Sequence, residues 1–211
     1  MILSIDTTHE FGSLALTHGA TLLEEVSLHS PDGFGHVLFE HLDALLQRHR
    51  RDVNQIECFA TAIGPGSFTG VRIGIACIKG LAEATGKPVV GVSNLEALAA
   101  FGAGPLRGPV MDARRGEIYG AVYDANGRMV HEEVVAKLPV WLASLPDQVE
   151  FVSMDFTQIG DAPVTKAPSA LAAAIGRIAH RRFEAGLAVD PALLDANYVR
   201  RSDAELLWKE Y

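Results

Sequence analysis

The chain has 211 residues, of which 48% are hydrophobic and 21% charged, and its 18 basic and 26 acidic side chains give a net charge of −8. This length and composition predict one large or two small domains with a substantial core, and they exclude wholesale disorder and a disulfide scaffold. The acidic balance argues against nucleic-acid binding that is driven by phosphate contacts alone.

The first half of the chain predicts three strands, a helix, a strand and a helix. The expected ranges are 2–5, 11–17, 21–28, 35–50, 56–63 and 69–85. The three opening strands are joined too closely for parallel crossovers, so we expect an antiparallel meander. Gly86 and Pro88 are the stop signals expected after the second helix.

The second half repeats this order less regularly. After a strand at 89–92, a short helix at 95–101 and a glycine- and proline-rich loop at 102–109, we expect further elements at 109–113, 117–123, 129–137, 139–145, 149–154 and 169–183. Three strands again precede helix, strand and helix, so the pattern predicts a duplicated β-β-β-α-β-α architecture. The expected lobes are residues 1–104 and 105–211, and no function is assigned to residues 125–195.

The remaining global features indicate a cytoplasmic protein. Cys58 and Cys77 lie outside any CxxC pair, as expected of buried thiols without a zinc or redox role. The opening Met1–Asp6 has no basic region, and no run of 18 apolar residues occurs, so we expect neither a signal peptide nor a membrane span.

A glycine-rich segment at 64–74, GPGSFTGVRIG, lies between a predicted strand and a predicted helix. Such a junction presents backbone N–H groups at the positive end of a helix, with Ser67 or Thr69 available as the cap. The spacing fits neither a P-loop nor the dinucleotide fingerprint, because Val71 follows Gly70 and the third glycine comes one residue late. A phosphate-binding turn and a tight turn whose glycines allow close helix packing both stay open.

This segment resembles the signature of the TsaB family, the bacterial partner subunit in tRNA threonylcarbamoyladenosine synthesis. The segments Ile5-Asp6-Thr7-Thr8, GVSNLEALA at 91–99 and DARRGEIY at 112–119 also resemble that family. The resemblance covers residues 1–124 well and 125–211 weakly. It implies an α/β fold of the two-lobed ASKHA (actin-like ATPase) class with a mixed sheet in each lobe, in agreement with the duplicated element order.

The resemblance also bears on whether the chain is an enzyme. The catalytic sister family, TsaD, carries a metal-binding H-x-x-x-H after the strand that corresponds to 89–92. Its two histidines align with Asn94 and Leu98 here; leucine cannot bind a metal, and asparagine is a poor substitute for imidazole. We therefore expect no catalytic residue, no metal and no cofactor, although ATP or ADP at an interface stays open. An independent ATP-dependent kinase or ATPase of the ASKHA type is the alternative.

A vestigial nucleotide or phosphate loop is the first candidate site. Kinases of this superfamily use an acidic residue after the first strand to place magnesium, and the following hydroxyls contact phosphate. For Asp6, the alternative is that its carboxylate caps its own turn. The candidate residues are Asp6, Thr7, Thr8, Gly64, Gly66, Ser67 and Thr69.

A docking surface on the helices at 35–50 and 69–85 is the second candidate. The resemblance implies that it binds a matching helix pair on TsaD or forms a homodimer in isolation, with TsaE in the same assembly and tRNA contacted only indirectly. Glycine inside a helix costs about 1 kcal/mol relative to alanine, and packing onto the sheet is not expected to account for that cost. The candidate interface residues are His36, Phe39, Gly70, Arg72, Ile73, Gly74 and Cys77. Arg114-Arg115-Gly116 and a short helix at Ala204–Trp208 could contact partners too.

Overall fold

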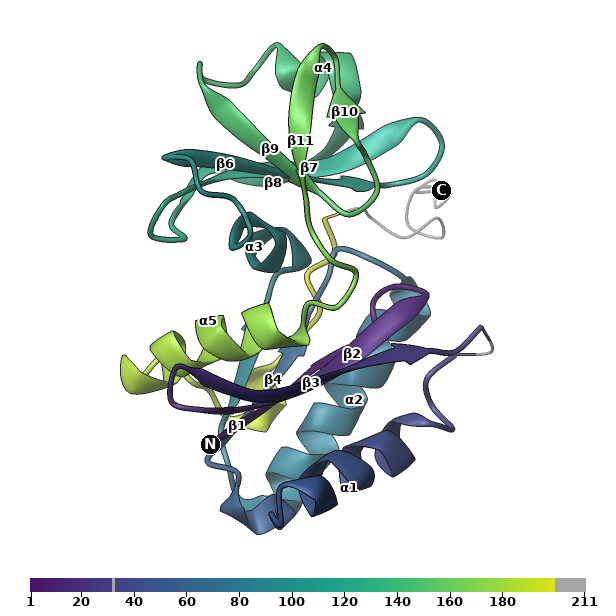
Figure 1. The fold of residues 1–211 in the computed structure, drawn as a ribbon, viewed down its shortest axis with the longest axis vertical. Helices are drawn as coiled ribbons and strands as arrows, with labels where there is room; N and C mark the ends of the chain where they lie inside the picture. Colours follow the sequence, from purple (N-terminus) through teal and green to yellow (C-terminus); the bar gives the residue numbers. More distant parts are fainter. Residues whose placement is uncertain (32, 200–211) are drawn as a thin grey trace, which may run out of the picture. The chain divides into compact units, whose positions relative to one another are not determined.

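A computed structural model describes residues 1–31 and 33–199, and the chain divides into two compact units (Figure 1). Unit 1 comprises Met1–Ala97 and Pro168–Ala196, and unit 2 comprises Leu98–Ala167 with the described residues 197–199. This division differs from the predicted lobes 1–104 and 105–211, because the segment after Pro168 returns to unit 1. The predicted helix at Ala204–Trp208 lies outside the described residues. Within the described part of the chain, no helix is long and apolar enough to cross a membrane.

Unit 1 is built on a five-stranded mixed sheet. Its strands are β1 (Ile2–Asp6), β2 (Phe11–His18), β3 (Thr21–His29), β4 (Cys58–Ala62) and β5 (Val89–Val92). They lie in the order β3-β2-β1-β4-β5, with β1, β2 and β3 antiparallel and β1, β4 and β5 parallel. The predicted meander and the strand at 56–63 are therefore confirmed.

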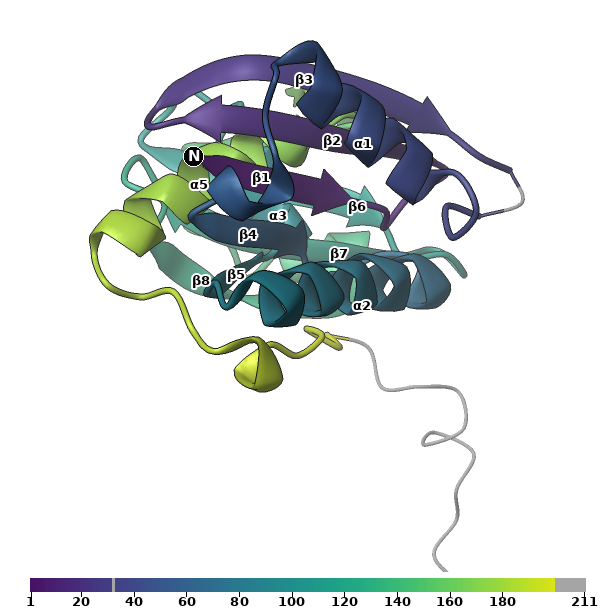
Figure 2. The ribbon, with the colours of Figure 1, turned by 90° about the horizontal axis from the view of Figure 1, so that it is seen from below.

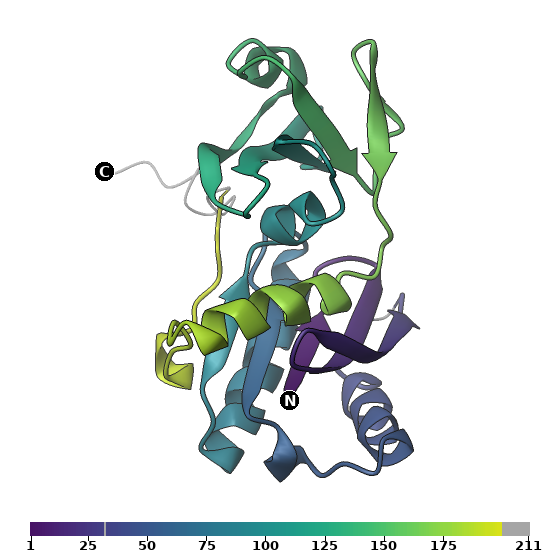
Figure 3. The same cartoon turned by 60° about the vertical axis from the view of Figure 1, so that its left-hand side comes forward.

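Helices cover both faces of this sheet. They are α1 (Leu38–Arg48), α2 (Phe68–Thr85), α3 (Asn94–Ala99) and α5 (Ala172–Glu184), with 3-10 turns η1 (Val53–Gln55) and η2 (Pro191–Leu193). Figures 2 and 3 show α1 and α2 on one face and α5 on the other. Spacing explains α1: Leu38, Leu42 and Leu45 recur on one side and are buried. As predicted, α2 ends at Gly86, whose φ of 64° is the left-handed conformation of a helix cap.

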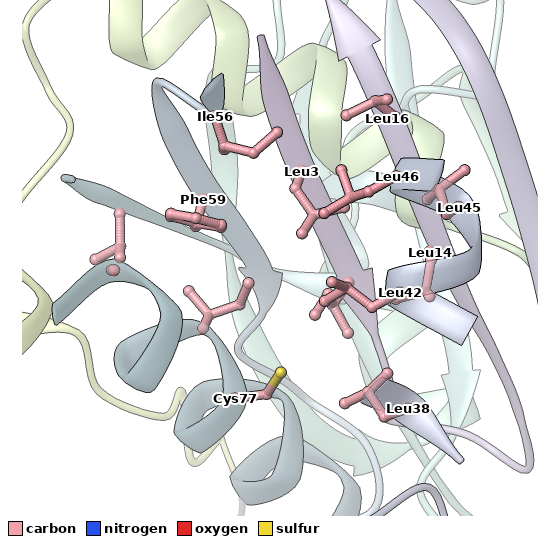
Figure 4. Close-up of a cluster of buried hydrophobic side chains, with 14 of the residues drawn as sticks. Leu3, Leu14, Leu16, Leu38, Leu42, Leu45, Leu46, Ile56, Phe59 and Cys77 are labelled. Atoms are coloured by element: carbon pink, nitrogen blue, oxygen red, sulfur yellow. The ribbon is translucent and has the colours of Figure 1, made fainter. Parts of the chain in front are cut away.

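The main core lies between the sheet and the pair α1 and α2 (Figure 4). Leu3 of β1, Phe59 of β4 and Cys77 of α2 meet the leucines of α1 there. Each fully buried leucine of this kind contributes roughly 1.5–3 kcal/mol to folding. Burial also raises the pKa of the Cys58 and Cys77 thiols to about 12, so both are protonated at neutral pH.

Close approach of α2 to the sheet accounts for its glycines. A Cβ on Gly70 would lie 1.9 Å from the carbonyl oxygen of Thr7, and one on Gly74 would lie 2.7 Å from Thr61 Oγ1 and 2.8 Å from Thr7 Oγ1. Both glycines are buried. The expectation that sheet packing leaves these glycines unexplained is therefore wrong.

Polar groups of the sheet hold the first turn of α5. Ser13 Oγ accepts hydrogen bonds from the Leu171 and Ala172 N–H groups at 3.1 and 3.0 Å, and Glu25 Oε1 accepts one from the Ala173 N–H at 2.7 Å. These bonds satisfy the free N–H groups that every helix has at its start. At the other end of the helix, Arg182 donates to the Gly91 carbonyl at 2.7 Å. These contacts are the reason why α5 belongs to unit 1.

Unit 2 repeats the sheet of unit 1. Its elements are β6 (Leu106–Asp112), β7 (Glu117–Asp124), β8 (Met129–Lys137), α4 (Leu138–Leu142), β9 (Val149–Ser153), β10 (Gln158–Ile159) and β11 (Ala162–Lys166). The order β8-β7-β6-β9-β11 matches β3-β2-β1-β4-β5, which confirms the predicted duplication. The short strand β10, which the sequence did not predict, stands between β9 and β11 where unit 1 has α2. Trp141 of α4 centres a separate core.

The packing of α2 predicts opposite effects for two glycine-to-alanine substitutions. We expect Gly74→Ala to lower the free energy of unfolding by about 1–3 kcal/mol, because the new methyl group overpacks against two buried threonine hydroxyls. Gly80 is exposed, with nothing within 4 Å of a Cβ, so Gly80→Ala is the matched control and is expected to add up to about 1 kcal/mol. Urea denaturation measures both. Equal stabilisation by the two alanines would contradict this account.

Neighbouring glutamates of β3 predict opposite pH effects. Burial raises the pKa of Glu25, whereas the hydrogen bond from Arg48 lowers the pKa of Glu24. A raised pKa in the folded state means that the contribution of Glu25 to stability falls as pH rises from the unfolded pKa through the folded one. A lowered pKa means that the contribution of Glu24 is present above its unfolded pKa and is lost in acid.

We therefore expect Glu25→Gln to gain stability relative to the unmodified chain between pH 4 and pH 7, and Glu24→Gln to lose it. Denaturant unfolding at several pH values checks both signs. Parallel pH profiles for the two variants would show that the environments of the two carboxyl groups do not differ in this way.

Candidate functional site

Asp6, Thr7 and Thr8 form a buried turn at the carboxyl end of β1. Asp6 Oδ1 accepts hydrogen bonds from the Thr8 N–H at 2.9 Å and from Thr8 Oγ1 at 2.7 Å. Asp6 thus caps its own turn, which was one of the two interpretations of this residue. Its second oxygen, Oδ2, has no hydrogen-bond partner among the described residues.

The glycine-rich loop lies against this turn. The Ser67 N–H donates to the Thr8 carbonyl oxygen at 2.7 Å, and a Cβ on Gly66 would lie 2.8 Å from that same oxygen. Ser67 Oγ accepts from the Gly70 N–H at 3.3 Å, so Ser67 is the helix cap and Thr69 is exposed in the first turn. The structure thus brings together both parts of the predicted loop site.

Asn94, at the start of α3, connects the two parts. Its Oδ1 accepts from the Gly64 N–H at 3.1 Å, and its Nδ2 donates to Thr8 Oγ1 at 2.6 Å. Its own N–H donates to the Gly64 carbonyl at 2.9 Å, and His9 Nε2 lies 3.4 Å from Nδ2. Asn94 is fully buried. Sequence reasoning considered this residue only for a metal-binding role or as a helix cap, and missed the bridge.

These contacts do not fit a nucleotide phosphate held by the loop. The N–H groups of Gly64, Ser67 and Gly70 already have acceptors within the chain, and a phosphate would have to displace them. Leu98, which aligns with the second histidine of the sister family, is buried and apolar. In residues 1–31 and 33–199, no group of three or more histidine, cysteine or acidic side chains could hold a metal ion.

The predicted interface residues separate into two sets. Gly70, Gly74 and Cys77 are buried toward the sheet, which corrects their assignment to a partner surface. His36, Phe39 and Arg72 are exposed, and Ile73 is half-buried.

Phe68, which sequence reasoning did not select, adds a second exposed aromatic ring. The Arg72 guanidinium stacks 3.7 Å from its centroid. Phe39 and Phe68 are 57% and 48% exposed. We use the name docking surface for the exposed residues His36, Phe39, Phe68 and Arg72 on α1 and α2. An aromatic residue beside the helix cap and four positions before an arginine was the signal available in the sequence.

Comparisons with known proteins agree with this fold. The family model described as TsaD, tRNA N6-adenosine threonylcarbamoyltransferase, matches residues 35–181. A Pseudomonas aeruginosa protein described as YeaZ superimposes with a TM-score of 0.78 at 26% identity, covering 93% of this chain and 98% of that one. A second P. aeruginosa structure, of an uncharacterized protein with similarity to peptidase YeaZ, gives a TM-score of 0.81 at 24% identity over 94% and 99%.

Curated relatives carry a more specific name. The tRNA threonylcarbamoyladenosine biosynthesis protein TsaB of Bacillus subtilis is 34% identical over 67% of this chain and 62% of that protein. The protein of the same name from Escherichia coli is 38% identical over 65% and 62%. The aligned segment therefore spans less than two thirds of either relative. Since the family model covers more than half of the chain and the named relatives are TsaB proteins, the chain belongs to the TsaD family and, within it, to the TsaB proteins.

Proposed function

We propose that this protein is an accessory, non-catalytic subunit in the synthesis of N6-threonylcarbamoyladenosine beside the anticodon of tRNAs. In this role it binds and stabilises a TsaD-type threonylcarbamoyltransferase, and a TsaE-type ATPase joins the same assembly. The names of the B. subtilis and E. coli relatives support the pathway. The fold alone would not, since related folds carry many functions.

The observation that carries the non-catalytic part is the use of the loop donors inside the chain. In open α/β sheets, ligands bind at the carboxyl ends of the parallel strands. Here the Gly64 and Ser67 N–H groups at that edge bond to Asn94 and Thr8. Asn94 and Leu98 also stand where the sister family has its metal-binding histidines. The edge is therefore shaped as a structural joint and is not arranged to turn over ATP.

The docking surface supports the partner-binding part. Aromatic and arginine side chains dominate the binding energy of protein interfaces, and Phe39, Phe68 and Arg72 place these residue types on two neighbouring helices. In isolation, the same surface would support a homodimer. The net charge of −8 fits a subunit that leaves most phosphate contacts with tRNA to its partner.

Reconstitution tests the proposal. Purified TsaD and TsaE are assayed for threonylcarbamoylation of tRNA with and without this chain, and co-purification of the three proteins is followed in parallel. We expect activity only when the chain is present. Full activity from TsaD and TsaE alone would overturn the accessory role, and phosphotransfer from ATP by the isolated chain would overturn the non-catalytic assignment.

Substitutions on the docking surface give a sharper prediction. We expect Phe39→Ala and Arg72→Ala each to weaken TsaD binding about tenfold or more, because exposed aromatic and arginine anchors lose the contacts that they make on association. Titration calorimetry measures the affinity. Val140→Ala, on α4 and 66% exposed, is the matched control and should bind like the unmodified chain. Unchanged affinity for both docking variants would place the interface elsewhere.

A further inference from the structure

Hydrogen bonds hold the loop before α2 at both of its ends. Gly64 is bound by Asn94 through its N–H and through its carbonyl oxygen, and Ser67 is bound by the Thr8 carbonyl. Three residues after Gly64, Ser67 caps α2, and the first turn of α2 carries Phe68 and Arg72. The conformation of this loop therefore sets where part of the docking surface lies.

Only a side chain with both a donor and an acceptor can make the bridge at position 94. The Thr8 hydroxyl gives its proton to Asp6 Oδ1, so Thr8 Oγ1 must accept from its other neighbour, Asn94 Nδ2. The Gly64 N–H needs an acceptor, which is Asn94 Oδ1. The amide orientation follows from these bonds. A carboxylate would supply the acceptor but no donor, and an alanine would supply neither.

We propose that Asn94 is a positioning residue for the docking surface: its buried amide joins the β1–β2 turn to the loop before α2 and so fixes the first turn of that helix. This inference rests on the function proposed above. Asn94 is fully buried, so its effect on a partner must pass through the loop and not through contact with the partner. Removal of the amide leaves the Gly64 N–H and the Thr8 hydroxyl without these partners, and the loop gains freedom.

The first experiment uses the isolated chain. Hydrogen–deuterium exchange over residues 64–72 is compared between the unmodified protein and Asn94→Ala, and between Thr8→Val and Thr8→Ser. We expect faster exchange in Asn94→Ala and in Thr8→Val, and nearly unmodified exchange in Thr8→Ser, which keeps the hydroxyl. Asn126→Ala, in the exposed turn after β7, is the matched control. Unchanged exchange in Asn94→Ala would overturn the proposal without any partner being present.

The second experiment measures TsaD binding. We expect Asn94→Ala to bind about fivefold to tenfold more weakly than the unmodified chain, and Asn94→Asp to be impaired as well, because it lacks the donor to Thr8. Thr8→Val combined with Asn94→Ala should be no weaker than either single variant, because both remove the same bridge. Full affinity in a folded Asn94→Ala protein would overturn the positioning role.

Formamide, the fragment that alanine lacks, separates positioning from general destabilisation. It should restore part of the affinity and slow the exchange of the loop in Asn94→Ala, with no such effect on Gly74→Ala, which is destabilised by another mechanism. Equal responses of both variants would overturn the specific role of the amide. If the unmodified chain fails to bind TsaD, the proposed function fails, and the exchange experiment still decides whether Asn94 fixes the loop.

Discussion

The carbonyl oxygen of Thr7 occupies the space in which a side chain at position 70 would have to lie. This contact draws the start of α2 onto the end of β1, and much of unit 1 follows from it. The loop between β4 and α2 is pressed against the β1–β2 turn, so Ser67 bonds to Thr8 and Thr7 Oγ1 donates to the Gly70 carbonyl at 2.7 Å. A larger residue at position 70 would separate the helix from the sheet and break these bonds together.

The two repeats have diverged at the equivalent turn. Asp6 and Asp112 each end the first strand of their sheet, and each carboxylate accepts the N–H two residues later, at 2.9 Å for Thr8 and 2.8 Å for Arg114. In unit 1 the turn is buried beneath the glycine loop. In unit 2 it is an exposed hairpin in which Arg114 and Arg115 have φ values of 65° and 57°. The same backbone motif therefore serves a closed joint in one unit and an exposed tip in the other.

Local signals in the sequence were sufficient for most elements of unit 1. Leucine spacing, the cap at Ser67 and the stop at Gly86 depend on neighbours within a few residues, and each was confirmed. The return of α5 to unit 1 could not be predicted, because the acceptors for its first turn, Ser13 and Glu25, lie about 150 residues earlier. The short strand β10 carries too few residues for a recognisable alternation.

The candidate site shows the same division between local and long-range information. The loop residues were identified because they are contiguous, but glycine alone does not say whether its open side meets a ligand, a partner or the protein's own backbone. For Gly70 and Gly74 only the position of β1 answers that question. Asn94 is separated by 86 residues from Thr8, so its bridge has no local signal at all.

Asn94 also changes how the loss of the sister family's histidines can be understood. Removing a metal ligand would by itself leave an empty edge of the sheet with unsatisfied N–H groups. An amide at this position instead donates to Thr8 and accepts from Gly64, so the edge is closed and its polar groups are paired. Under the proposed function, one residue type accounts for both features of the subunit: the strand ends do not bind a nucleotide, and the helix that carries Phe68 and Arg72 begins from a fixed loop.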